Sequence, residues 1–490
     1  MPVESTSRSL ARSVIGGAGI IGAAGAVSRS FSLLSAPILT QLLGPSPYGL
    51  VALLSTVTAF ATTLSLLGMD SSYSRYFFSD KEARRDSVER FCWRFSLVSA
   101  LLVGIAAGTA WWFLGPRASL MPEFAAVVVA GVILSVLGAM GTTMRRLRGA
   151  YGRIAVSTLF VGGVGAIVSI GVAVYVRRDA WALLAGTICG LTAGAAILGM
   201  PPRGTLFRKS GLAVAERWEI LRLGIVGAYI APAYWLMNSA DRWFLAAWRG
   251  QGELGVYSFA GSIATVGIMV NSAVTLAWFP EVTRVYEVSR DEAPDQVGRI
   301  WVRLVGGLLV VWLAVVSSGG DILRLLADRR FHTGAACIPW LAGGVFFYGV
   351  CSLANTGLFL RKDLKPVAVW WTVGALGNVA LNALLVKAYG AAGSAIAACL
   401  CYALVAAGVM WSAQARVCLA VDWRKLSVAG GVTLGAGMAM FIPWSDSPAA
   451  SLLMKFPAGL ACAVFLLRLL APDWYRRFGA GKIFGGGGPA

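Results

Sequence analysis

The sequence predicts an all-α integral membrane protein of about fourteen transmembrane helices. Hydrophobic residues make up 57% of the 490 residues and charged residues only 13%, whereas about a quarter of a soluble chain of this length is charged. Apolar runs of about 20 residues, the length that crosses the hydrocarbon core as a helix, recur along the chain. Between these runs, loops rich in lysine and arginine alternate with loops that are poor in them, which indicates repeated crossing.

Fourteen apolar segments are long enough to be spans. Arg8 and Arg12 precede the first segment, which continues well past the core of a cleavable signal peptide, so we interpret it as a span. Tyr389 and Gly390 form a very tight joint between the eleventh and twelfth segments. The predicted spans are 13–42, 48–67, 93–114, 122–144, 154–176, 181–200, 220–248, 255–278, 300–326, 336–360, 366–386, 391–411, 426–442 and 448–470.

The positions of lysine and arginine predict the orientation. With the N-terminus inside, thirty of the 42 basic residues fall in inner segments, seven in outer loops and five within spans. Because cytoplasmic loops are enriched in basic residues, we expect a multi-pass protein of the bacterial inner membrane with both termini cytoplasmic. The net charge of +19 arises in these loops, so nucleic acid is not an expected partner.

The sequence offers little that could support catalysis or bind a metal. His332 is the only histidine of the chain, which excludes a His-based metal site or triad. None of the eight cysteines forms a CxxC pair, and we interpret them as small buried hydrophobes. A polymerase or glycosyltransferase would need a carboxylate cluster or a large outer loop, and neither is present. We therefore predict no enzyme activity, no catalytic residue, no metal and no cofactor.

A weak internal repeat divides the predicted helices. LGPSPYGL at 43–50 opens the second span, and GQGELGVY at 250–257 opens the eighth in the same orientation. This recurrence after six spans predicts two six-helix bundles, 1–212 and 213–424, followed by two additional helices and a flexible tail, 425–490. Repeated bundles with a site between them are a common plan of transporters.

Three stretches of the chain have features in common with one group of exporters. Residues 33–78 contain LLGPSPYG and then GMD followed by an arginine, residues 238–280 begin NSADRWFLAAWRGQGELGVY, and residues 377–402 are GNVALNALLVKAYGAAGSAIAACLCY. Their order, spacing and orientation resemble the polysaccharide (O-antigen and exopolysaccharide) flippase branch of the multidrug/oligosaccharidyl-lipid/polysaccharide exporter superfamily. The resemblance covers much of the first twelve predicted helices.

The resemblance implies a flippase that moves undecaprenyl-diphosphate-linked oligosaccharides to the outer leaflet by alternating access. The headgroup would lie in a hydrophilic cavity between the bundles while the lipid tail stays in the membrane. The product would serve a surface polysaccharide such as lipopolysaccharide or exopolysaccharide. Expected partners are the lipid-linked oligosaccharide, membrane lipid, a coupling ion (proton or sodium), and a polysaccharide polymerase with its chain-length regulator.

Charged residues within spans are costly, which makes them candidate functional residues. Arg29 lies deep in the first span on a face with Gly22, Gly25 and Ser32. We interpret it as a substrate-binding residue in a cavity, with a structural ion pair as the alternative. Arginine suits a diphosphate because its guanidinium keeps its charge and donates bidentate hydrogen bonds to phosphate oxygens.

The seventh span carries the second group of candidates. Tyr234, Asn238 and Arg242 are spaced four residues apart and share one face, on which we expect contact with the anionic headgroup. Asp241 points about 100° away from Arg242, so we expect it to pair across helices or to titrate as a coupling residue. The alternative is an interfacial charge cluster, because position 242 is close to the outer end of the span.

Further charged residues lie near span ends. Asp70 and Arg75, at the inner end of the second span, are candidates for gating the cytoplasmic mouth, with an orientation charge as the alternative for Arg75. Asp321 and Arg324 are expected to form a local pair one helical turn apart. Lys455 is expected to extend to the membrane surface.

Two other functions remain open on the same fold. One is a cation-coupled multidrug or metabolite exporter. The first six spans hold no carboxylate in their apolar interiors, and the nearest acids, Asp70, Glu123 and Asp179, lie at span edges. This argues against such an exporter. The other is a flippase for a peptidoglycan lipid precursor.

Overall fold

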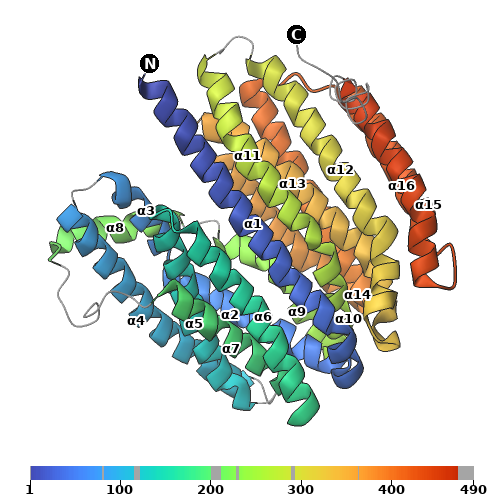
Figure 1. Ribbon diagram of the computed structural model, residues 1–490, viewed down its shortest axis with the longest axis horizontal. Coiled ribbons are helices and arrows are strands. Elements are labelled where there is room, and N and C mark those ends of the chain that lie inside the picture. Colours follow the sequence, from blue (N-terminus) through green and yellow to red (C-terminus); the bar gives the residue numbers. More distant parts are fainter. Residues whose placement is uncertain are drawn as a thin grey trace, which may run out of the picture. The chain divides into compact units, whose positions relative to one another are not determined.

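The computed structural model describes residues 2–79, 82–114, 122–199, 211–227, 231–288, 293–361 and 363–472. In these ranges the chain is helical and forms no strand (Figure 1). Eleven helices of this part are long and apolar enough to cross a membrane. The predicted all-α class is confirmed, and the chain is a multi-pass membrane protein.

The chain divides into two compact units. Unit 1 comprises Met1–Ser258, Leu326–Phe331 and Asn378–Ala391, and unit 2 comprises Phe259–Leu325, His332–Gly377 and Ala392–Ala490. The bundle boundaries at 212 and 424 stay a prediction.

The helices are α1 (Pro2–Leu43), α2 (Pro45–Leu66), α3 (Met69–Ser79), α4 (Glu82–Leu114), the 3₁₀ helix η2 (Pro122–Phe124), α5 (Ala125–Leu147), α6 (Tyr151–Tyr175), α7 (Ala180–Leu198), α8 (Val214–Gly227), α9 (Ala231–Trp248), α10 (Gly250–Ala264), α11 (Val266–Val288), α12 (Ala293–Leu326), the 3₁₀ helix η3 (Arg329–Cys337), α13 (Ile338–Leu360), α14 (Lys365–Val417), α15 (Trp423–Phe441) and α16 (Pro448–Leu470).

Most predicted spans coincide with these helices, and the span 448–470 coincides with α16. The predicted span 220–248 instead contains the end of α8 and all of α9, and residues 228–230 lie outside the described part. The predicted span 255–278 is interrupted between α10 and α11 at Thr265. The short helix α3 lies outside every predicted span, and α8 lies only partly within one, because charged residues interrupt the apolar runs of both helices.

The predicted joint at Tyr389 and Gly390 is confirmed. The 53-residue helix α14 bends at Gly390, whose φ of 57° and ψ of −133° are non-helical. Glu253 accepts a hydrogen bond at its Oε1 from the backbone N–H of Ala391 at 2.6 Å, which caps the second half of the helix. A Cβ at Gly390 would collide with the Glu253 carboxylate, so this turn requires glycine both for its positive φ and for space.

Small residues allow the helices of unit 1 to pack closely. On α7, Gly186 lies against Gly165 of α6, and Gly190 lies against the backbone carbonyl of Val161. A Cβ at Gly186 or Gly190 would overlap these atoms. Because lipid tails are as apolar as side chains, close backbone approach of this kind is a main source of helix association in membranes.

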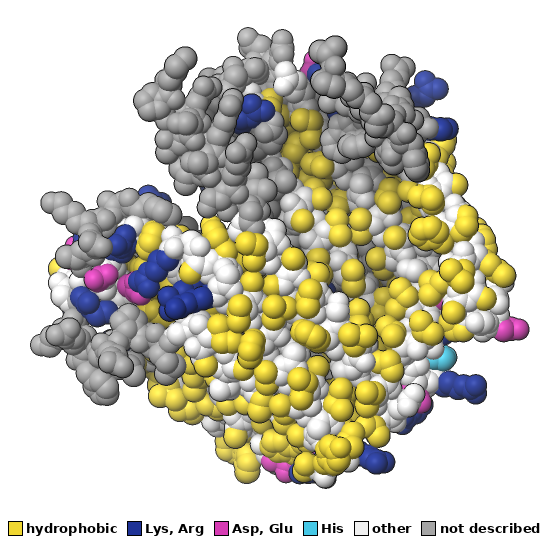
Figure 2. All heavy atoms as spheres, viewed as in Figure 1, with side chains coloured by type: hydrophobic (Ala, Val, Ile, Leu, Met, Phe, Trp, Pro, Cys, Tyr) yellow, Lys and Arg dark blue, Asp and Glu magenta, His cyan; other side chains and the backbone are white. Residues whose placement is uncertain are grey.

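A buried polar network joins α3 and α4 to Arg148, the residue that follows α5, in unit 1. Glu89, which is 3% exposed, accepts at Oε2 from the Tyr73 hydroxyl at 2.8 Å and from Arg148 Nη2 at 2.6 Å. Burial, and then the adjacent Glu89 carboxylate, raise the pKa of Tyr73 above its usual value. Figure 2 shows Lys and Arg side chains gathered near this end of unit 1, whereas hydrophobic side chains cover the helix sides.

Unit 2 corrects two expectations about charged residues. Asp321 does not pair with its neighbour Arg324, which is exposed. Its Oδ2 accepts instead from Lys455 Nζ at 2.7 Å. Lys455 does not extend to a surface, because its side chain is only 4% exposed. The spacing of residues along one helix cannot reveal a partner that another helix supplies.

Candidate functional site

Helix α9 carries the candidate residues of the predicted seventh span and is fastened to α2. The indole Nε1 of Trp235 donates to the carbonyl of Thr56 at 2.9 Å. The Trp235 ring also packs on Phe60 with centroids 4.4 Å apart. These contacts fix the rotation of α9, so neighbouring residues of the helix face different surroundings.

Arg242 is half-buried and directed at α2. Its Nη1 donates to the Ser55 hydroxyl at 3.2 Å and lies 3.4 Å from the carbonyl oxygen of Ala52. Its Nε is buried and has no acceptor among the described residues. A guanidinium has five N–H donors in a planar fork, and these two contacts leave donor capacity unused. An unsatisfied buried donor is costly, so the position favours an acceptor supplied by a ligand.

Asp241 faces α10 rather than α2 and is 7% exposed. Its Oδ2 accepts from the Tyr257 hydroxyl of α10 at 2.5 Å, and its Oδ1 accepts from the backbone N–H of Arg242 at 2.8 Å. The carboxylate of Asp241 and the guanidinium of Arg242 therefore have separate partners, as their angular separation on the helix predicts. Asp241 is a buried acid held by a hydroxyl and an amide.

Tyr234 and Asn238 lie on the same face of α9 as Arg242. Both are exposed, and Asn238 Nδ2 donates to the backbone carbonyl of Tyr234 at 2.8 Å. Helix α9 is labelled in Figure 1. The helix thus presents a hydroxyl, an amide and a guanidinium in a row, and all of these groups can bind a sugar or a phosphate.

Arg29 lies on α1 and is exposed. The neighbouring Ser28 and Phe31 face α6, where they contact Gly162 and Gly163. Arg29 therefore lies off the packed face of its helix. The structure places Arg29 and Arg242 on α1 and α9, and each of these helices contacts α2.

The two gating candidates lie on the short helix α3. Asp70 is half-buried in its first turn, and Arg75 is exposed one and a half turns later. The buried acid of this region is Glu89, which sequence reasoning missed because it precedes the apolar run of its helix. Tyr257 was missed as well, although it belongs to the repeated turn at 250–257 and could have been singled out as a hydroxyl beside a glycine turn.

Unit 2 contains an apolar groove of about 1160 Å³ lined by α12, α13, α14 and α15. Trp301, Trp312, Phe346, Leu400 and Met438 are among its lining residues. No charged side chain occurs among the described residues that line it. Its chemistry suits a hydrocarbon chain and does not suit a sugar or a phosphate.

The described residues show no metal centre, because no three His, Cys, Asp or Glu side chains gather where they could hold an ion. The chemistry available on α9 is anion binding by a guanidinium, together with hydrogen bonding by a hydroxyl and an amide.

Sequence comparison identifies one family. Residues 38–293 match the family described as "Polysaccharide biosynthesis protein". No curated protein matches the chain in sequence.

Several solved structures share the fold. "Lipid II flippase MurJ, inward closed conformation" aligns with a TM-score of 0.71 at 12% identity, covering 94% of this chain and 99% of that chain. The inward-facing conformation of a multidrug resistance MATE family transporter of the MOP superfamily aligns with a TM-score of 0.57 at 13% identity, covering 80% and 94%. The outward-facing conformation of a multidrug resistance MATE family transporter of the MOP superfamily aligns with a TM-score of 0.54 at 16% identity, covering 83% and 95%. At these identities the likeness concerns the fold.

Proposed function

Because this chain belongs to the polysaccharide biosynthesis protein family, we propose that it is a flippase for undecaprenyl-diphosphate-linked oligosaccharides. The family and the shared fold confirm the predicted resemblance to the flippase and multidrug exporter superfamily. The proposed movement is from the cytoplasmic to the outer leaflet of the bacterial inner membrane by alternating access. Both termini would be cytoplasmic, and a surface polysaccharide such as lipopolysaccharide or exopolysaccharide would be the product.

The observation that carries this proposal is the buried, unsatisfied Nε of Arg242. A diphosphate that leaves water needs replacement donors, and a guanidinium supplies them in a geometry that matches phosphate oxygens. The exposed Asn238 and Tyr234 on the same face would bind the sugar hydroxyls. Arg29 on α1 would supply a second cationic contact.

The apolar groove of unit 2 supports a substrate with a hydrocarbon part. A polyprenyl chain brings no charge and no hydrogen-bonding group, which matches a lining without charged side chains. The proposed substrate therefore has a polar part that suits α9 and an apolar part that suits the groove.

For coupling, the proposal assigns Asp241 to a proton or sodium ion, and Asp70 with Arg75 to gating at the cytoplasmic side. Asp241 is buried and is not neutralised by an arginine fork. The same observation favours the second candidate function, a cation-coupled exporter. A polysaccharide polymerase and a chain-length regulator would be the partners that consume the flipped lipid.

The test uses the full-length protein in proteoliposomes with a fluorescent polyprenyl-diphosphate disaccharide, whose arrival in the far leaflet is followed by quencher accessibility. We expect Arg242→Gln to slow translocation about tenfold or more, since a charge-assisted contact is lost. Arg178→Gln, which changes an exposed arginine between α6 and α7, is the matched control.

Unchanged translocation in Arg242→Gln would refute the assigned binding site. Preferred movement of a muropeptide-bearing polyprenyl diphosphate would identify a peptidoglycan-precursor flippase instead. Movement of a hydrophobic organic cation against a proton or sodium gradient, without lipid movement, would identify the exporter.

A further inference from the structure

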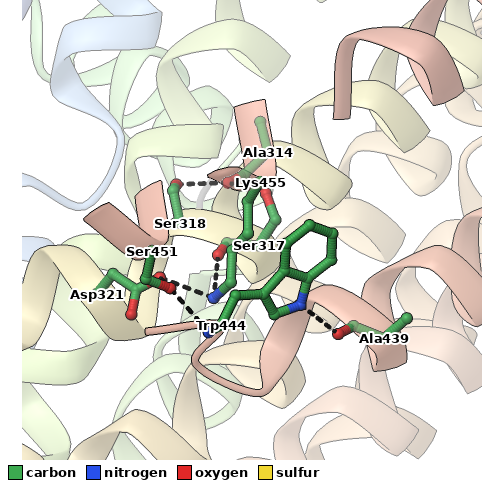
Figure 3. A network of polar contacts seen from close by, with 8 residues as sticks. All are labelled: Ala314, Ser317, Ser318, Asp321, Ala439, Trp444, Ser451 and Lys455. Carbon is green, nitrogen blue, oxygen red and sulfur yellow. Dashed lines mark hydrogen bonds and ion pairs between the residues drawn. The ribbon is translucent and has the colours of Figure 1, made fainter. Parts of the chain in front are cut away.

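A buried ion pair joins the last helix to α12 in unit 2 (Figure 3). Lys455 Nζ donates to Asp321 Oδ2 at 2.7 Å and lies 3.3 Å from the carbonyl oxygen of Ser317. The Ser451 hydroxyl donates to the same Asp321 oxygen at 2.9 Å. The Lys455 and Asp321 side chains are 4% and 2% exposed. The same network reaches the α15–α16 turn, where the Trp444 backbone N–H donates to Ser451 Oγ at 3.1 Å.

The pair lies on the buried face of α16, which also includes Leu466 and Leu470 farther along the helix. On α16 the buried residues in the half near the α15–α16 turn are Ser451 and Lys455, one helical turn apart. In the same half, Leu453 and Phe456 are 75% and 70% exposed. This half of α16 is therefore apolar where it faces outward and polar where it meets α12.

In a bilayer, polar contacts of this kind hold a helix to its neighbour more strongly than apolar contacts do. Apolar side chains gain little by leaving lipid for a neighbouring helix, because the tails are equally apolar. A buried charge pair does gain from the contact, because each partner alone in hydrocarbon would be an uncompensated charge. The Asp321–Lys455 pair with Ser451 is thus the polar contact that α16 loses on detachment, beside the close packing of Leu470 on Gly306 at the other end of the helix.

The attachment of α16 also determines the position of α15. The two helices form a hairpin, and α15 supplies Thr433, Gly437 and Met438 to the lining of the apolar groove. A Cβ at Gly437 would lie 2.9 Å from the Trp312 ring, so α15 meets α12 closely across the groove. Movement of α16 away from α12 would carry this wall with it.

We propose that Asp321 and Lys455 are positioning residues that hold the α15–α16 hairpin on α12 and so keep α15 as a wall of the groove for the polyprenyl chain. The positioning role stands on the contacts above, whereas the identity of the chain in the groove rests on the proposed function. The pair does not contact the substrate. It acts through the position of α15.

The first measurement is backbone hydrogen exchange of the full-length protein in lipid nanodiscs. The double variant Asp321→Leu/Lys455→Met removes the pair without leaving a buried charge, so it inserts at least as readily as the wild type. We expect exchange over α15 and α16 to accelerate about tenfold or more, because polar attachment is lost. The exchanged pair Asp321→Lys/Lys455→Asp should restore most of the protection, and Met454→Leu, at an exposed position of α16, should not change it.

Unchanged protection of α15 and α16 in the double apolar variant would overturn the positioning role, as would equal acceleration by Met454→Leu. The second measurement uses a long-chain polyprenyl phosphate with a diazirine in its tail. In the wild type it should label α12 and α15, and labelling of α15 should fall in the double variant. Absence of labelling in the wild type would refute the groove as the lipid site, while the exchange result would still decide the role of the pair.

Discussion

Gly49 and Gly255 meet backbone to backbone where the start of α2 packs against α10. A Cβ at Gly49 would overlap the carbonyl oxygen of Gln251 and lie 2.9 Å from the backbone nitrogen of Gly255. A Cβ at Gly255 would overlap the carbonyl oxygen of Pro45. The two repeated turns found in the sequence, 43–50 and 250–257, are therefore in reciprocal contact, each using its glycine to admit the other.

Alanine at either glycine should destabilise unit 1. We expect Gly49→Ala and Gly255→Ala each to cost about 1–3 kcal/mol, because the added carbon has no space and backbone must shift. The measurement is thermal stability in detergent, followed by fluorescence-detected size exclusion. Gly252→Ala is the matched control in the same turn, since a Cβ at Gly252 meets nothing within 4 Å. Equal loss in the control would contradict the explanation.

Removal of the Glu253 carboxyl should weaken the bend of α14. Glu253→Ala loses the acceptor for the Ala391 N–H, and we expect a cost of about 1 kcal/mol, as for other helix caps. Glu253→Gln retains a side-chain oxygen at the same position and should keep most of the stability. The same thermal assay distinguishes them, and an identical loss in both variants would show that the charge, and not the cap, is what matters.

The Glu89 network should contribute to the stability of α3, α4 and α5. Arg148 is half-exposed, so solvent screens its attraction to Glu89. We expect Glu89→Leu to lower the free energy of unfolding by about 1–3 kcal/mol, mainly because the buried Tyr73 hydroxyl loses its acceptor. The control is Asp86→Asn on the same helix, where the side chain is exposed. Equal thermal stability of Glu89→Leu and the wild type would rule out this role.

Tyr73 should make unit 1 sensitive to high pH. Its pKa is raised in the folded state by burial and by Glu89, so its neutral form is the stabilised one. This contribution is complete below the unfolded pKa of about 10 and is lost as pH rises through the folded value. Tyr73→Phe should therefore lose less thermal stability between neutral pH and strongly alkaline pH than the wild type. A steeper alkaline loss in Tyr73→Phe would show that the sign is wrong.

Arg29→Gln should lower translocation of the polyprenyl-diphosphate probe without lowering thermal stability. Arg29 is exposed and lies off the face of α1 on which Ser28 and Phe31 meet α6, so the substitution leaves the packing of that face in place. We expect a several-fold decrease in rate, less than for Arg242→Gln. A drop in stability with unchanged translocation would favour the alternative structural role.

Sequence patterns were sufficient to predict the structural features that depend on a single segment of the chain. Run length located the helices, since spanning hydrocarbon requires a continuous apolar stretch, and Gly390 marked a joint because few other residues adopt its backbone angles. The common face of Tyr234, Asn238 and Arg242 followed from helical spacing. The sequence missed α3 and the first part of α8, because these segments carry charges and lack the long apolar runs used to locate spans.

The partners of those side chains depended on the tertiary structure. Asp321 has a basic neighbour three residues away, yet it binds Lys455, which is 134 residues away in the chain. Likewise Asp241 binds Tyr257, and Arg242 turns toward Ser55 of α2. The sequence determines which residues are polar and on which face of a helix they lie. Only the packing of helices decides which polar group each one meets, because a buried charge selects whichever partner three-dimensional proximity supplies.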